Sequence, residues 1–342
     1  MITQDRIDLK FKKLIKNKEN TWLITGVAGF IGSNILFELL KMNQKVIGID
    51  NFSTGKKKNL DFIKKSLNKN QWKKFTFFKA DLNHFSFLKL KNKKIDYVLH
   101  QAARGSVIRS IIDPVQTNND NIGAFLKVIN ASRILKVKNF VYASSSSVYG
   151  DSKTLPKQEF HKGNLLSNYA LTKYTNEKYA EVFFRQYKFK SIGLRYFNVF
   201  GKFQDPNGSY AAVIPRWINS TINKKDIFIF GDGRTSRDFS PAMNVVYANL
   251  LAALSKTKSY NYIFNVGNEE RTTLNYLAKL ILKNVKTNKK KSKIIFKKFR
   301  KGDIRHSLAD IRKIRKMLKY YPLVKFEDGL TSTIEWFEKN NV

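Results

Sequence analysis

The chain contains no cysteine, and this absence excludes several kinds of site. Without thiols there is no disulfide, no thiolate metal site and no cysteine nucleophile. Histidine is also scarce, and its four positions lack the spacing of metal ligands. They are His84, His100, His161 and His306. We therefore interpret each histidine as a structural or surface residue and predict no metal site.

Long apolar segments are missing as well. No run of about 18 apolar residues occurs, and residues 1–20 are charged and lack the apolar core of a signal peptide. We expect a cytoplasmic protein with no membrane partner. At 342 residues the chain exceeds the usual size of one domain, which predicts a large α/β domain with a smaller one appended.

Acidic residues are few relative to basic ones. The chain has 26 Asp and Glu against 64 Lys and Arg, a formal net charge of +38. Such a charge attracts polyanions non-specifically and favours negatively charged small substrates. The excess is mainly lysine, spread along the chain with abundant Asn, Ile and Phe, which AT-rich codons encode. Because no recognition motif accompanies the charge, we attribute it to codon bias and expect no specific nucleic-acid partner.

Short apolar segments alternate with amphipathic ones. A polar helix is expected up to about residue 20, with Ile7, Phe11, Leu14 and Ile15 at helical spacing and packed on the main domain. Strands are predicted at residues 21–25, 46–49, 75–79, 95–99, 140–143 and 191–194. This alternation predicts an α/β fold with a Rossmann-type, doubly wound parallel sheet that binds ligands at the carboxyl ends of its strands.

A glycine-rich loop follows the first predicted strand. Gly26, Gly29 and Gly32 have the spacing Gly-x-x-Gly-x-x-Gly, and an amphipathic helix comes next. Between a strand and a helix, such glycines let the backbone approach a pyrophosphate, whose charge the helix N-terminus stabilises. The second strand ends at Asp50, where a carboxylate would bind an adenosine ribose and favour NAD over a 2′-phosphorylated cofactor.

A phenol and an ammonium group lie four residues apart in a helical-looking segment. Tyr169 and Lys173 would share one helix face, so that the cation favours the phenolate and lowers the pKa of Tyr169. Ser145 follows a predicted strand, where its hydroxyl would donate to a substrate alkoxide or carbonyl. No histidine and carboxylate pair is placed to activate this serine, which argues against a hydrolase. We predict Tyr169 as a general base.

These motifs together resemble the extended short-chain dehydrogenase/reductase family. Further matches narrow the resemblance to nucleotide-sugar 4-epimerases, in the branch similar to bacterial UDP-N-acetylglucosamine 4-epimerases of surface-polysaccharide pathways. The matching segments are residues 50–55, 100–103, 194–201, 205–208 and 300–310. The likeness covers nearly the whole chain from about residue 21 onwards.

The resemblance implies a redox-neutral C4 epimerisation of a UDP-sugar through a transient 4-keto sugar, with NAD retained through the cycle. Tyr169 would be the base, Ser145 would assist it, and Lys173 would lower the pKa of the phenol and hold the nicotinamide ribose. The implied cofactor contacts are Gly26, Gly29, Phe30, Ile31, Gly32, Asp50, Asn51, Phe52, Ser53, Thr54, Gly55, Asp81, Leu82, Gln101, Ala102, Ala103, Asn121, Tyr169, Lys173 and Tyr196.

Substrate contacts follow from the same resemblance. The implied residues are Gly105, Ser106, Ser145, Ser146, Tyr169, Asn198, Ala212, Val213, Trp217, Arg237, Arg300, Asp303 and Ser307. Arg237 and Arg300 would lie nearest the phosphates, since each guanidinium offers a fork of donors to diphosphate oxygens.

The identity of the sugar is open at this point. Ser307 matches a position where a bulky aromatic residue narrows the sugar pocket in other epimerases. A small serine there predicts room for a 2-N-acetyl group, and therefore UDP-N-acetylglucosamine and UDP-N-acetylgalactosamine as the preferred pair. Arg104 replaces the small or apolar residue expected before Gly105, so a charged sugar such as a uronate is an alternative, as is UDP-glucose.

Two further hypotheses compete. A 4,6-dehydratase or a net NAD-dependent oxidoreductase would use the same scaffold, but dehydration needs an extra acid and base where this chain has Ser146 and Ser147. A non-catalytic NAD- or nucleic-acid-binding protein would use the basic surface itself. Intact Ser145, Tyr169 and Lys173 argue against that version.

The domain boundaries and the assembly are also predicted. We expect an NAD-binding Rossmann domain at residues 1–198, with 238–258 returning to it, and a smaller C-terminal α/β substrate domain from 199–237 and 259–342. The resemblance implies a homodimer joined by helices flanking the sheet, including the one that carries Tyr169. Residues 240–244 depart from the family's usual aromatic and acidic residues without a sequence-based reason, and residues 286–293 are predicted to form a solvated, mobile loop.

Overall fold

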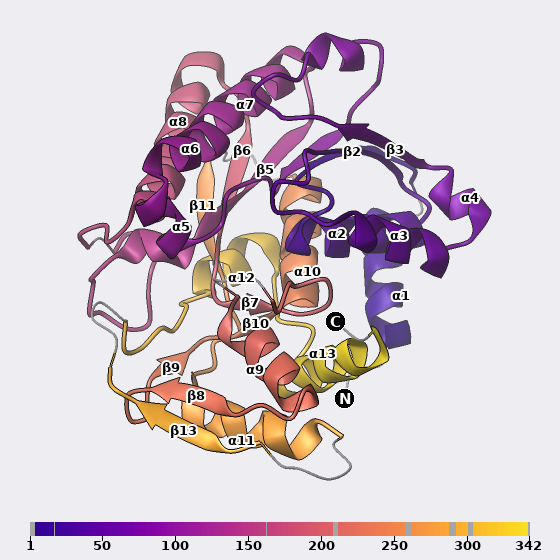
Figure 1. The fold of residues 1–342 in the computed structure, drawn as a ribbon. Helices are drawn as coiled ribbons and strands as arrows, with labels where there is room; N and C mark the ends of the chain where they lie inside the picture. Colours follow the sequence, from indigo (N-terminus) through magenta and orange to yellow (C-terminus); the bar gives the residue numbers. More distant parts are fainter. Residues whose placement is uncertain are drawn as a thin grey trace.

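A seven-stranded parallel sheet forms the centre of the computed structural model, which describes residues 4–16, 18–161, 163–207, 211–256, 261–286, 292–299 and 304–340. The strand order is β11-β6-β5-β4-β1-β2-β3, and all neighbouring strands run parallel. The strands are β1 (Thr21–Thr25), β2 (Lys45–Asp50), β3 (Phe75–Lys79), β4 (Tyr97–His100), β5 (Asn139–Ser145), β6 (Ser191–Tyr196) and β11 (Tyr262–Val266). Helices cover both faces of this sheet (Figure 1).

The predicted Rossmann-type α/β fold is confirmed, and each of the six predicted strands is present with small shifts at its ends. The seventh strand, β11, was placed by the prediction within the substrate domain. It pairs instead with β6 at the edge of the central sheet. The segment was not among the predicted strands, and its pairing with β6 identifies it as part of the sheet.

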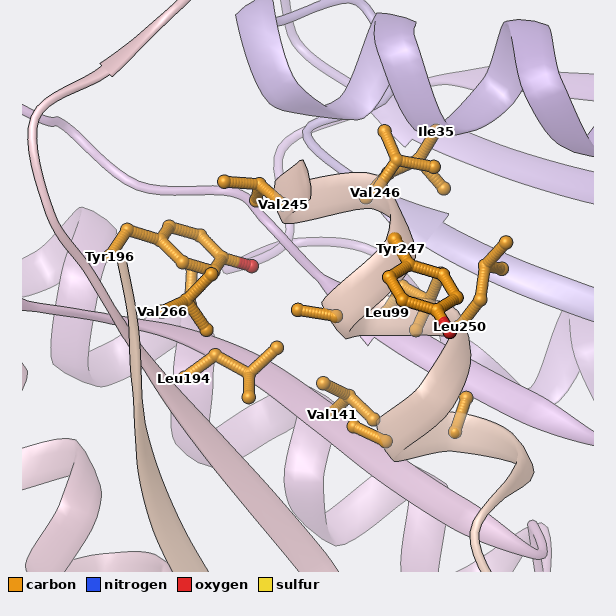
Figure 2. Close-up of a cluster of buried hydrophobic side chains, with 14 of the residues drawn as sticks. Ile35, Leu99, Val141, Leu194, Tyr196, Val245, Val246, Tyr247, Leu250 and Val266 are labelled. Carbon is orange, nitrogen blue, oxygen red and sulfur yellow. The ribbon is translucent and has the colours of Figure 1, made fainter. Parts of the chain in front are cut away.

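One face of the sheet is covered by α1 (Gln4–Ile15), α2 (Phe30–Lys41), α10 (Ala242–Leu254) and α12 (Arg312–Leu318). Figure 2 shows Val246 of α10 next to Ile35 of α2, with Val141 and Leu194 of the strands in the same buried cluster. Because α10 is enclosed on nearly all sides, it is apolar around most of its circumference.

The first helix follows its predicted pattern. Ile7, Phe11 and Ile15 are buried, Leu14 packs against the same cluster, and Phe11 stacks on Tyr247 of α10. The packing of this helix on the main domain is therefore confirmed.

The opposite face of the sheet is covered by α7 (Ala124–Ile134) and α8 (Asn168–Tyr187). Several shorter elements come before α7 in the chain, and the last of them is a π-helical turn that continues directly into α7. These elements are α3 (Lys57–Ser66), α4 (Lys69–Trp72), the 3-10 turn η1 (Phe87–Leu90), α5 (Val107–Ile112), α6 (Pro114–Asn118) and the π-helical turn η2 (Asn119–Gly123). The 3-10 turn η3 (Ser146–Tyr149) continues from β5.

A separate, smaller apolar cluster lies beyond the strand ends. It is built by α9 (Val213–Ile222), β8 (Ile227–Phe230), α11 (Leu274–Asn284), β13 (Ile294–Lys297) and α13 (Phe326–Asn340). β8 and β13 pair in parallel (Figure 1). Short pairings connect the two regions: β7 (Val199–Phe200) with β10 (Ser240–Pro241), and β9 (Ser236–Arg237) with β12 (Thr272–Thr273).

The unusual segment 240–244 has a structural role. Asn244 is fully buried, and its Oδ1 accepts hydrogen bonds from the backbone N–H groups of Leu323 (2.8 Å) and Val324 (2.9 Å). Its Nδ2 donates to the Val324 carbonyl at 2.8 Å. A buried amide with these partners attaches the segment before α13 to α10.

Two further observations concern expectations from the sequence. Within the described ranges, no helix combines the length and the apolar character that crossing a bilayer requires. Of the loop predicted at residues 286–293, positions 287–291 lie outside the described residues.

Candidate active site

A cavity of about 550 Å³ opens at the carboxyl ends of the central strands. It spans the point between β1 and β4 where the strand order reverses, which is where open α/β sheets bind ligands. The glycine loop and Asp50 line one end of it, and Ser145, Tyr169 and Lys173 line the other.

The glycine loop is packed so closely that a side chain at either of two positions would clash with neighbouring backbone. Gly26 has φ +69°, and a Cβ there would lie 2.7 Å from the Ala102 backbone. A Cβ on Gly32 would lie 2.0 Å from the Gly26 carbonyl oxygen. Helix α2 begins directly after Gly29 with no side-chain cap, so its first N–H groups are available to a bound anion. These residues fit the pyrophosphate of a dinucleotide.

Asp50 is held rigidly beside this loop. Its carboxylate accepts the backbone N–H of Ala28 at 2.9 Å and that of Phe52 at 2.8 Å. Burial raises the pKa of Asp50, and these amide hydrogen bonds oppose that rise. Gly55 packs so closely that a Cβ would lie 2.8 Å from the carboxylate. An acceptor fixed at this place fits an adenosine ribose.

Most of the predicted cofactor contacts line this cavity. They are Gly26, Gly29, Phe30, Ile31, Gly32, Asp50, Asn51, Ser53, Thr54, Asp81, Leu82, Gln101, Ala102, Ala103, Tyr169, Lys173 and Tyr196.

Three predicted cofactor contacts lie outside the lining. Phe52 packs on Phe77 with ring centroids 5.4 Å apart, and Gly55 lies behind Asp50. Asn121 is buried, where it accepts the Arg104 backbone N–H at 2.7 Å. These three residues lie behind the residues that line the cavity and support them.

The candidate catalytic side chains come from two elements. Helix α8 begins at Asn168 because Ser167 caps it, accepting the Ala170 N–H at 3.1 Å, and Tyr169 therefore lies in the first turn. Ser145 ends β5 and hydrogen-bonds the Tyr169 phenol. Lys173 is buried, and its Nζ donates to the Ala143 carbonyl at 2.9 Å.

The electrostatics of this group differ from the prediction. Burial raises the pKa of Tyr169, whereas the hydrogen bond with Ser145 lowers it. Burial also lowers the pKa of Lys173, to about 8. The expected lowering of the phenol's pKa by Lys173 is therefore not the dominant effect, because desolvation disfavours the charged form of both groups. Ser145 is the neighbour that favours the phenolate form of Tyr169.

A second cavity of about 280 Å³ adjoins the first, and Asn198 and Ala212 line both. Of the predicted substrate contacts, the first cavity holds Gly105, Ser106, Ser145, Ser146, Tyr169, Asn198 and Ala212. The second holds Asn198, Ala212, Val213, Trp217 and Arg237.

Of the other predicted substrate contacts, Ser307 alone lies within the described residues. The Ser307 backbone N–H donates to the Ser236 carbonyl at 3.1 Å, and Ser307 lines neither cavity. Its role in sugar choice stays a prediction. Arg300 and Asp303 lie outside the described residues.

Several lining residues were missed from the sequence. Arg216, Phe228 and Phe230 line the second cavity. The alternation of β8 was an available signal, since Ile227 and Ile229 are buried in the core and the phenylalanines between them face the other way. Arg109 lines the first cavity and carried no sequence signal that separated it from surface arginines.

Arg104 lies in the wall of the first cavity with its charge already paired. Its Nε donates to Asp120 Oδ2 at 2.9 Å, and its guanidinium lies 3.6 Å from Asp113 Oδ2. Asp120 lines the same cavity and also accepts from Gln116 at 2.8 Å. The sequence identified the arginine but not its carboxylate partner.

An open parallel sheet, a dinucleotide-shaped loop at its switch point and a Ser, Tyr and Lys set in one cavity define a Rossmann-type enzyme that uses a nicotinamide cofactor. Comparison with known proteins narrows this class. Residues 22–267 match the NAD dependent epimerase/dehydratase family, and the chain belongs to that family.

Individual relatives cover nearly the whole chain. A solved UDP-N-acetylglucosamine 4-epimerase from Methanobrevibacter ruminantium, in complex with UDP-N-acetylmuramic acid, is 36% identical; the match covers 94% of this chain and 99% of that one, with a TM-score of 0.86. A UDP-glucose 4-epimerase from Thermotoga maritima with UDP-glucose is 34% identical, covers 94% of this chain and 100% of that one, and has a TM-score of 0.82. A UDP-glucuronate 4-epimerase of Thermodesulfobacterium geofontis is 31% identical over 93% of this chain and 96% of its own. The predicted family, the NAD-dependent isomerase class and the NAD cofactor are confirmed.

Proposed function

We propose that the protein interconverts the C4 epimers of a UDP-sugar, with UDP-N-acetylglucosamine and UDP-N-acetylgalactosamine as the preferred pair. The observation that carries this proposal is the convergence of Ser145, Tyr169 and Lys173 on a cavity that also contains the glycine loop and Asp50. The base and the glycine loop therefore line the same cavity.

The chain's own residues supply proton transfer and orientation. NAD, when bound, would supply a reversible hydride acceptor. Tyr169 accepts the proton of the C4 hydroxyl, and Ser145 donates to the same oxygen, which stabilises the charge that develops there. Lys173, held by the Ala143 carbonyl, places a cation 5.9 Å from the centre of the Tyr169 ring, which adds to the effect of Ser145 on the phenolate.

The second cavity holds the nucleotide in this proposal. Arg237 is oriented by the carbonyls of Ser236 (3.0 Å) and Arg305 (3.2 Å), and a fixed guanidinium suits phosphate oxygens. Phe230 and Trp217 supply apolar surface for a flat base. A nucleotide fixed there leaves the sugar free to present either face in the first cavity.

Features of the first cavity favour a neutral, acetylated sugar. Gly105 faces open space, with nothing within 4 Å of an added Cβ, and Ser146 offers a hydroxyl. The charge of Arg104 is already neutralised by Asp120, which argues against recruiting a uronate through that side chain. Ser147 donates its hydroxyl to Ser145 at 2.9 Å, so a hydroxyl stands where a dehydratase would need an acid or a base.

The experiment that tests this proposal needs no added cofactor. Purified protein is incubated with UDP-N-acetylglucosamine, UDP-glucose or UDP-glucuronate in separate reactions, and the C4 epimers are measured by NMR. We expect conversion of the acetylated sugar at the highest kcat/KM. Conversion of UDP-glucuronate alone would show that the substrate is a uronate and not the acetylated sugar. If none of the three sugars is converted, the proposed function is wrong.

We also propose a homodimer, supported by an exposed apolar face. Ile111 and Ile112 of α5 and Val115 of α6 are 61%, 67% and 71% exposed, and Leu171 and Val182 of α8 extend this face. Both α5 and α6 contact α8, and exposed apolar side chains on neighbouring helices are typical of protein interfaces. Analytical ultracentrifugation should show a dimer that Ile112→Arg converts to a monomer; a monomeric wild type would contradict this proposal.

A further inference from the structure

A buried ion pair lies beneath the catalytic end of the cavity. Glu177 of α8 and Arg195 of β6 are each 6% exposed. Arg195 Nε donates to Glu177 Oε1 at 2.9 Å and its NH2 to Oε2 at 2.7 Å, a bidentate arrangement. Apolar residues replace such pairs with little loss of stability, so stability alone does not account for this one.

The pair is connected to the strand that carries Ser145. Ser144 Oγ donates to Glu177 Oε1 at 2.6 Å, and Ser144 lies beside Arg195 in the register of β5 and β6. Ser144 is only 3% exposed, so this hydrogen bond is shielded from water. The ion pair therefore holds the residue directly before Ser145.

The same helix face carries both the base and this attachment. Tyr169, Lys173 and Glu177 follow one another at intervals of four residues along α8. Lys173 binds the Ala143 carbonyl and Glu177 binds the Ser144 hydroxyl, so two successive residues of β5 are attached to two successive turns of α8. The next residue of β5 is Ser145, opposite Tyr169.

We propose that Glu177, oriented by Arg195, is a positioning residue that acts through Ser144 to fix the end of β5 against α8, and so sets where Ser145 Oγ meets the Tyr169 phenol. This inference rests on the proposed function. Because the Ser145 hydrogen bond lowers the pKa of Tyr169 against the effect of burial, loosening the attachment should make the base harder to ionise.

Ser144→Ala is the variant that separates the attachment from the ion pair, because it leaves Glu177 and Arg195 intact. We expect kcat to fall about 10- to 100-fold, the scale of a misplacement of about 1 Å, with KM for the UDP-sugar nearly unchanged. The limb of the pH–rate profile that reports Tyr169 should move to higher pH. Ser144→Thr restores the hydroxyl and should recover most of the rate.

Two controls identify the route of the effect. Ser132→Ala removes another buried hydroxyl, which donates to the Val128 carbonyl within α7 and lines neither cavity, and should keep the wild-type rate. In a Ser145→Ala background, Ser144→Ala should cause no further loss of kcat, since it acts through Ser145. An equal loss in both backgrounds, or a full kcat in Ser144→Ala, would overturn the inference.

A crystal structure of the Ser144→Ala protein gives a readout independent of turnover. The hydrogen bond between Ser145 and Tyr169 should lengthen or break, and its preservation would overturn the inference. Should the wild type convert no sugar nucleotide, the proposed function fails, while this comparison still decides whether Ser144 positions Ser145.

Discussion

The two ends of the main cavity are built by different means. At the cofactor end the backbone makes the shape: a Cβ on Gly32 would lie 2.0 Å from the Gly26 carbonyl oxygen. At the phenol end side chains make the shape, through the bonds that join Ser144, Glu177 and Arg195. The cofactor end depends on glycines, which have no side chains, within one short loop. The phenol end depends on charged and hydroxyl side chains that belong to separate elements.

Removing the phenol should break one end and spare the other. Tyr169→Phe should lower kcat by about 10² to 10⁴, the range that a positioned general base contributes, while the purified protein keeps its NAD. Rates come from NMR, and NAD is measured after denaturation. The matched control is Tyr174→Phe, on the same helix outside the cavity lining, which should retain the wild-type rate. A Tyr169→Phe rate within tenfold of wild type would remove Tyr169 from the role of base.

Breaking the ion pair should test how much the phenol end depends on charge. Arg195→Met leaves Glu177 buried without its partner and should cost about 3–5 kcal/mol of unfolding free energy. Denaturant unfolding measures this cost. The double variant Arg195→Met with Glu177→Leu should recover much of it, because no uncompensated charge remains. A single variant as stable as wild type would show that water or another group solvates Glu177.

Adding one methyl group should break the cofactor end. Gly32→Ala places its Cβ against the Gly26 carbonyl oxygen, so the loop has to shift; we expect a cost of about 1–3 kcal/mol and a clear fall in bound NAD. Gly105→Ala is the matched control for stability, since an added Cβ there meets nothing within 4 Å. Equal NAD content in Gly32→Ala and wild type would show that this loop does not hold the cofactor.

The pH dependence of stability sharpens the comparison at α2, the helix that follows the glycine loop. Burial raises the pKa of Glu38 from 4.5 to about 7 in the folded chain. The folded state therefore binds more protons between these values, and this carboxyl's contribution to stability, present below about pH 4.5, is lost as the pH rises through about 7.

Glu38→Gln should remove this dependence. The variant should gain about 3 kcal/mol over wild type at pH 8 and almost nothing at pH 4.5, measured by denaturant unfolding at both values. Asp61→Asn is the control, because that carboxylate is 48% exposed and pairs with Lys57 at the surface. A gain that is the same at both pH values would mean that ionisation of Glu38 is not its cause.

Much of the fold was predictable because its signals are local. The spacing of Ile7, Phe11 and Ile15 predicted a buried helix face, and the apolar segments predicted six strands in nearly their observed places. Strand β11 was missed because its membership in the sheet depends on pairing with β6, about 70 residues earlier, as the bond between Ser191 and Asn261 also shows.

The candidate site divides in the same way. Gly26, Gly29, Gly32 and Asp50 were recognised from their order along the chain, and all four line the cavity. The partner that neutralises Arg104 was not recognised, because Asp120 lies 16 positions further along the chain in another element.

By itself the sequence determined six of the seven strands of the central sheet, the glycine loop and the helix face that carries the phenol and the lysine, because each depends on the spacing of nearby residues. Only the tertiary structure decided the electrostatics of that phenol. Ionisation depends on how far surrounding atoms exclude water and on which hydroxyl reaches the ring oxygen, and both are set by elements that meet only in the folded chain.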